Sequence, residues 1–252
     1  MEKSLRKIII ALLLVLRAFY ITAQDISGSI REEIRIRLWS EIDKYPGGKF
    51  EDGDLEIKIE GDSESTSKNN EKEDPLAVYR YGINRIRELA PYLMSGMLYG
   101  WTFDYTPGDK KRGVSEFFDY ELIKKFDKNE NSITMHYPIV KDEQLVTWAW
   151  CRRTPYQIDL YDNWVSVTNP KIHGSGSASV ELGFDGIREA CGRAIKDAVR
   201  NYYQQTIKNK PKEISGRVIL SKEPQVYIRN GQYTVDLDFF METDRITLYT
   251  FY

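Results

Sequence analysis

The chain has 252 residues, with 36 Lys and Arg against 38 Asp and Glu, which gives a formal net charge of −2. A chain of this length suits one large domain or two small ones and can bury a sizeable core. Its slightly acidic balance argues against binding to nucleic acid or to an anionic membrane, because both need a surplus of basic side chains.

The first 23 residues are predicted to be a cleavable secretory signal. A basic start precedes an apolar run over residues 8–16, and the stretch ends with a small residue, Ala23, before Gln24. The alternative is a retained membrane anchor. A membrane span needs about 20 apolar residues, and this run has nine before Arg17 interrupts it. Cleavage would leave a chain without a transmembrane span.

The predicted export points to a bacterial envelope. The start of the chain is strongly basic, and no Asn-x-Ser/Thr acceptor for N-glycosylation occurs in the sequence. We therefore expect the mature protein to be periplasmic or otherwise extracytoplasmic. The signal holds four basic residues and one acidic residue, so the mature protein would carry a net charge of −5.

The part of the chain after the signal, residues 24–59, is predicted to form a helix and a short strand. Ser29 and Glu32 have the spacing of a capping box, which places a helix over residues 29–44. Apolar residues recur there at every fourth position: Ile30, Ile34, Leu38 and Ile42. Apolar and charged residues alternate over residues 55–59, as in a strand.

A polar segment separates this part from the rest. Residues 60–74 contain no apolar side chain, so they are predicted to be a mobile loop. Residues 75–252 are then the main α+β domain. This domain begins with a second helix, for which Asp74 can act as the N-cap, and Pro91 is expected to kink or end that helix.

The middle of the chain is predicted to be rich in strands. A strand over residues 98–105 precedes a short helix or surface loop over residues 110–127. Two hairpins are predicted next, over residues 133–152 and 157–168. Residues 173–177, His-Gly-Ser-Gly-Ser, are predicted to be a flexible link into another strand.

The C-terminal part is predicted to be a long helix followed by strands. The helix, over residues 185–208, has one apolar stripe: Ile187, Cys191, Ala194, Ile195, Ala198 and Tyr202. Among the strands, Asn230-Gly231 lies between two alternating runs and is a strong hairpin signal. Short connections between strands predict an α+β fold, with a mainly antiparallel sheet built from hairpins and two to three amphipathic helices packed on it.

No catalytic, cofactor or metal site is predicted. The two histidines, His136 and His173, have no second ligand at metal spacing, and a zinc site needs three or four protein ligands. Asp236 and Asp238 would share one face of a strand, where two carboxylates could hydrolyse a glycan. The sequence favours the simpler interpretation that they lie on the solvent face of an antiparallel sheet.

Cys151 and Cys191 are candidates for a disulfide. They can pair in an oxidising compartment, provided that the strand of Cys151 lies beside the helix of Cys191. The alternative is two buried thiols in different parts of the core.

Trp148, Trp150 and Trp164 are candidate ligand-binding aromatic residues. Trp148 and Trp150 alternate on one face of a predicted strand. They could stack on sugars or on a partner protein, or they could be core residues beneath a helix.

Because no catalytic constellation is found, the sequence favours a non-enzymatic exported envelope protein, structural or accessory, that acts through contacts with another envelope protein. One alternative is an envelope glycan- or ligand-binding module that uses the surface aromatic residues. A carboxylate-based hydrolase is the less favoured alternative.

Overall fold

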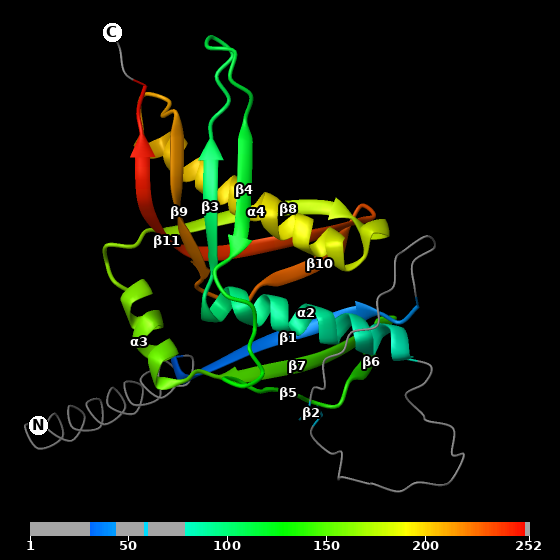
Figure 1. Cartoon of the computed structure of the whole chain (residues 1–252). Helices are drawn as coiled ribbons and strands as arrows, with labels where there is room; N and C mark the ends of the chain where they lie inside the picture. The colour runs from blue at the N-terminus through cyan, green and yellow to red at the C-terminus, as the bar shows by residue number, and fades with distance from the viewer. Residues whose placement is uncertain (1–30, 44–57, 60–78, 250–252) are drawn as a thin grey trace, which may run out of the picture.

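The computed structural model describes residues 31–43, 58–59 and 79–249. The predicted signal, most of the predicted strand at 55–59 and the polar segment at 60–74 lie outside these residues. The described part has an α+β fold in which helices pack on two mainly antiparallel sheets, as the sequence predicts (Figure 1). Within these residues, no helix is both long and apolar enough to cross a membrane.

The smaller sheet has the strand order β1–β7–β5–β2, with β6 paired to another part of β7. Its strands are β1 (Glu33–Glu41), β2 (Lys58–Ile59), β5 (Ile133–Met135), β6 (Ile139–Lys141) and β7 (Gln144–Arg152). All its pairs are antiparallel except β2 with β5. The predicted hairpin over residues 133–152 is present, and Asp142 and Glu143 form its turn with positive φ angles of 52° and 61°.

The helix predicted over residues 29–44 is wrong, because this segment contains strand β1. An apolar residue at every fourth position fits a strand as well as a helix, since four is a multiple of the strand period of two. Ile36 decides between them: Ile34, Ile36 and Leu38 are all buried. The segment pairs along its whole length with β7.

The larger sheet has the strand order β10–β11–β9–β3–β4, with β8 on the other side of β11. Its strands are β3 (Trp101–Thr106), β4 (Phe117–Leu122), β8 (Lys171–Ser179), β9 (Glu213–Leu220), β10 (Gln225–Arg229) and β11 (Gln232–Thr247). The predicted turn at Asn230-Gly231 connects β10 to β11, and both residues have positive φ angles. A register shift between Thr243 and Arg245 marks a bulge in β11, and bulges bend a strand.

Two predictions for the larger sheet are wrong. The predicted helix or loop over residues 110–127 contains strand β4, which pairs with β3. The predicted flexible link at residues 173–177 lies within strand β8, because Gly174 and Gly176 are the points where helix α4 touches the sheet. A Cβ atom at Gly174 would lie 2.0 Å from the Ala194 carbonyl oxygen, and one at Gly176 would lie 2.1 Å from that of Ala190.

Two long helices cover the sheets. Helix α2 (Arg80–Leu98) packs on β1 of the smaller sheet, and α4 (Phe184–Thr206) packs on β8 and β11 of the larger one (Figure 1). The prediction of α4 is confirmed. Pro91 does not end α2, which continues to Leu98.

The hairpin predicted over residues 157–168 is also wrong, because the chain forms helix α3 (Pro155–Trp164) there. Thr154 and Gln157 make a complete capping box, and Pro155 fits the first turn. The side-chain amide of Gln157 also donates to Tyr99 and Asn131, at 2.7 Å each. This helix start signal outweighs Asp162-Asn163, a residue pair typical of turns, which suggested the hairpin.

The predicted disulfide between Cys151 and Cys191 is not formed, and both cysteines are buried free thiols. Cys151 lies in β7, under α2, whereas the helix of Cys191 packs on β8 and β11 instead. Burial raises the pKa of both thiols to about 12. Both cysteines are therefore unreactive core residues.

Candidate functional site

The outer face of the smaller sheet combines aromatic and basic side chains. Because strand residues alternate between faces, the buried residues of β1 and the β7 residues opposite them point to α2, and the residues between them point away from it. In the antiparallel register Arg35 stands opposite Trp150, and Arg37 stands opposite Trp148. These four residues are called the Arg–Trp face below.

The Arg–Trp face is open to solvent. Arg35 and Arg37 are exposed, Trp148 is 39% exposed and Trp150 is half-buried. The ring of His136 lies beside Trp150, with 4.6 Å between the ring centroids. The predicted pair Trp148 and Trp150 thus shares one accessible sheet face.

The two arginines of this face differ from most others in their lack of partners. The side chains of Arg35 and Arg37 form no ion pair or hydrogen bond with a residue that the structure describes. Only the backbone N–H of Arg37 is engaged, and it donates to a Glu223 carboxylate oxygen at 2.6 Å. Among the described residues, no acceptor occupies the donors of these two guanidinium groups.

Trp164 does not belong to this surface. It lies at the end of α3, is only 4% exposed, and packs against Ile219 and Phe240 of the larger sheet. The prediction that it binds a ligand is therefore wrong, because its ring is part of the core.

An open groove lies between strand β4 and helix α4. It is lined by Phe118, Tyr120, Asp185, Arg188, Glu189, Gly192, Arg193 and Lys196. Its basic side chains are already paired: Arg188 with Asp185, Arg193 with Glu189, and Lys196 with Glu116. Internal pairing leaves this groove with less to offer a charged ligand than the Arg–Trp face.

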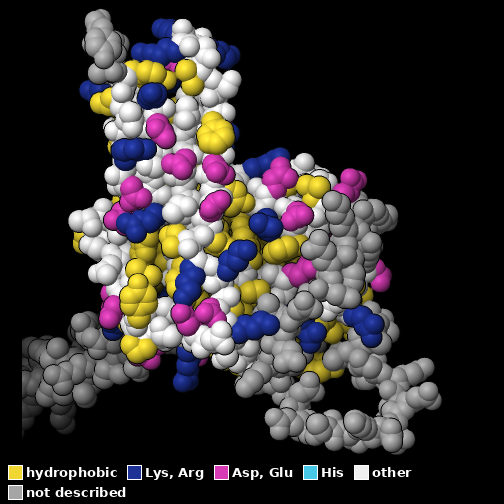
Figure 2. Space-filling model, viewed as in Figure 1, with side chains coloured by type: hydrophobic (Ala, Val, Ile, Leu, Met, Phe, Trp, Pro, Cys, Tyr) yellow, Lys and Arg dark blue, Asp and Glu magenta, His cyan; other side chains and the backbone are white. Residues whose placement is uncertain are grey.

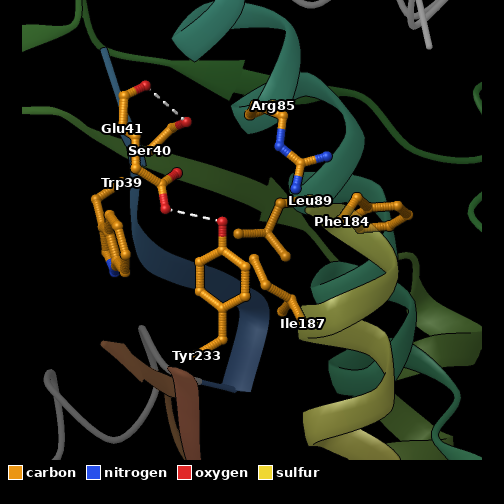
Figure 3. A pocket seen from close by; sticks show the side chains of 8 residues that line it. All are labelled: Trp39, Ser40, Glu41, Arg85, Leu89, Phe184, Ile187 and Tyr233. Atoms are coloured by element: carbon orange, nitrogen blue, oxygen red, sulfur yellow. Dashed lines mark hydrogen bonds between the residues drawn. The ribbon is translucent and has the colours of Figure 1, made fainter. Parts of the chain in front are cut away.

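A second, enclosed space lies where α2, β1, β11 and the start of α4 meet (Figure 3). The Tyr233 hydroxyl donates to a Glu41 carboxylate oxygen at 2.8 Å, and Arg85 donates to Glu88 at 2.8 Å. Burial, together with the Glu41 carboxylate, raises the pKa of the Tyr233 hydroxyl.

This enclosed junction is structural. It has room for no more than about one water molecule. One guanidinium nitrogen of Arg85, Nη2, is buried without a hydrogen-bond partner among the described residues, and a water molecule there would satisfy it. The junction fixes α2 against both sheets but is too small for an organic ligand.

Asp236 and Asp238 lie on one face of strand β11, away from the core, as the simpler interpretation of the sequence expects. Asp238 contacts His173 and Lys222, each at 3.2 Å, and Asp236 accepts from the Tyr227 hydroxyl at 2.8 Å. Both are half-buried on the face of the larger sheet opposite α4. In the described ranges, no group of three or more His, Cys, Asp and Glu side chains could hold a metal ion.

Sequence reasoning found the tryptophans of the candidate site but missed its arginines. The alternation Ile34-Arg35-Ile36-Arg37-Leu38 is the signal that could have found them. It places both arginines on one face of a strand, whereas a helix would have placed them about 200° apart around its axis.

Comparisons with known proteins give a family but no activity. A protein-family model matches residues 22–249, nearly the whole chain. The chain belongs to this family. The match carries no statement of function. Over 180 residues the chain is 28% identical to an uncharacterized protein of Treponema pallidum (strain Nichols), a match that covers 66% of this chain and 70% of that protein. No solved structure matches the chain.

Proposed function

We propose that this protein is a non-enzymatic, exported envelope protein that binds another envelope protein through the Arg–Trp face. The observation that carries the proposal is the pair of exposed arginines, Arg35 and Arg37, which have no side-chain partner among the described residues and lie beside the exposed ring of Trp148. Trp and Arg are the residues that most often dominate the binding energy of protein interfaces.

The charge of the face indicates what it binds. A guanidinium group binds a carboxylate through two parallel hydrogen bonds, so two free arginines favour an acidic surface on the partner. The neighbouring strand β6 adds one exposed apolar side chain to this face, Ile139, which stands opposite Val146 of β7. An apolar area with charged anchors is the composition expected of a protein interface.

The export part of the proposal rests on the predicted signal. The family model begins at residue 22, beside the expected cleavage before Gln24. This agreement supports a family-wide mature domain that starts after the signal.

A glycan is the second candidate ligand, because Trp148 and Trp150 share an accessible face on which sugar rings could stack. The unpaired arginines favour an acidic glycan over a neutral one. The hydrolase alternative has less support, since Asp236 and Asp238 already contact Tyr227, His173 and Lys222.

Arg37→Glu and Trp148→Ala are each expected to weaken capture of the partner by about 30-fold, as interface anchors do. The measurement is a chemically crosslinked pull-down from envelope fractions of the host, quantified by mass spectrometry. Lys125→Glu and Tyr156→Ala are the matched controls, because both residues are exposed and lie outside the face.

Two results would contradict this proposal. One is a captured protein whose yield is the same with Arg37→Glu as with the wild type. The other is capture of material that contains no enriched protein and is lost when soluble acidic glycans are added. That result would favour the glycan-binding alternative.

A further inference from the structure

The free end of the β3–β4 hairpin carries a concentrated positive charge. The loop between these strands meets the segment after α4 there, because the Lys210 ammonium group donates to the Gly108 carbonyl oxygen at 2.7 Å. Six exposed basic residues come together: Lys110, Lys111, Arg112, Lys208, Lys210 and Lys212. They are called the basic apex below. Figure 2 shows Lys and Arg side chains gathered at this end of the molecule.

Hydrogen bonds, an ion pair and a ring contact hold the apex in shape. Asp109 is buried and accepts from the backbone N–H of Lys111 at 3.0 Å, and it also pairs with the side chain of Arg112. The guanidinium of Arg112 lies 4.3 Å from the centre of the Tyr249 ring. The backbone N–H of Lys212 donates to Thr247 at 2.8 Å, which ties the second segment to β11.

The apex overturns an expectation from the net charge, namely that the protein has too few basic side chains to bind an anionic membrane. Asp109 is the one acidic residue within its two segments, residues 107–112 and 207–212. Of the acidic residues close to these segments along the chain, Glu116 pairs with Lys196 and Glu213 pairs with Arg245. The whole chain carries −2, so the residues outside the apex and Asp109 together carry −7. The apex is therefore a basic surface on a chain whose other residues are net acidic.

Apolar side chains accompany the basic ones. Leu248 is 61% exposed and Ile246 is 41% exposed, at the end of β11 beside the apex. Surfaces that bind reversibly to membranes combine these two features, because the apolar groups enter the boundary of the acyl chains while the basic groups contact anionic headgroups.

We propose that the basic apex docks on the surface of an anionic lipid bilayer. The loop between β3 and β4, which carries three of these exposed basic residues, lies at one extremity of the described structure, where a flat surface can reach it (Figure 1). The Arg–Trp face lies in the other sheet, at the far end from the hairpin tip (Figure 1). This inference does not depend on the proposed function, because it uses a separate surface.

The test is cosedimentation of the host-processed protein with vesicles of phosphatidylcholine, with and without phosphatidylglycerol. We expect binding only to the anionic vesicles, and we expect salt to weaken it. Each lysine near such a surface strengthens binding by about fivefold, so Lys110→Glu, Lys111→Glu and Lys208→Glu together should weaken it by at least about a hundredfold. Leu248→Ser should weaken binding further at high salt.

The matched control makes the same charge change elsewhere, with Lys125→Glu, Lys141→Glu and Lys222→Glu combined. All variants are first compared with the wild type by circular dichroism. Equal loss of binding in both triple variants would show a general charge effect and overturn the proposal. The proposal would also be overturned if the wild type did not bind anionic vesicles, or if it bound both vesicle types equally.

Discussion

Gly176→Val is expected to lower the free energy of unfolding by at least about 3 kcal/mol. Strand β8 and helix α4 approach so closely that the new Cβ atom would lie 2.1 Å from the Ala190 carbonyl oxygen and 2.5 Å from the Ala194 backbone nitrogen. Both contacts are with helix backbone, which cannot turn aside as a side chain can. The helix would have to lift off the sheet.

The measurement is urea unfolding followed by far-UV circular dichroism. Ser175→Ala is the matched control, because Ser175 is the next residue in the strand and points to the exposed face. That variant should stay within about 0.5 kcal/mol of the wild type. Equal midpoints for Gly176→Val and the wild type would show that α4 does not rest on β8.

Ala198→Asp should lower the free energy of unfolding by a comparable amount, several kcal/mol, because it buries an unpaired carboxylate. Ala198 is 1% exposed, and its Cβ atom lies only 2.8 Å from the place where a Cβ atom of Gly174 would be. The new carboxylate would be buried against the backbone of β8 at Gly174.

Thermal unfolding compares this variant with Gln204→Asp, which adds the same charge on an exposed position of the same helix. Gln204→Asp should lower the melting temperature only slightly, whereas Ala198→Asp should lower it by many degrees. Similar melting temperatures for the two variants would contradict the packing of this helix face.

Features with local causes could be predicted from the sequence. Helix α4 was predictable because its apolar stripe, from Ile187 to Tyr202, runs for more than four turns, at about 3.6 residues per turn. Asn230-Gly231 was predictable because few residues tolerate positive φ in a tight turn. Strand β1 was missed because its spacing of four fits both periods, and the alternation around Ile36 that separates them was given no weight. The capping box at Thr154 was present in the sequence but competed with a turn signal.

Features with tertiary causes could not be predicted in the same way. The glycines at 174 and 176 look like a linker until α4 is placed against them. The basic apex joins residues about 100 positions apart, so no local window contains it. The Arg–Trp face needed β1 and β7 to pair, which is why only its tryptophans were foreseen.

Photocrosslinking from position 148 tests the central claim most directly. The host would express the protein with Trp148 replaced by p-benzoylphenylalanine, and a second strain would carry the same residue in place of the exposed Tyr156. We expect an adduct with one envelope protein from position 148 alone, attached at an acidic surface of that protein and lost when Arg37→Glu is added. No adduct from position 148, or the same adduct from both positions, would contradict binding through the Arg–Trp face.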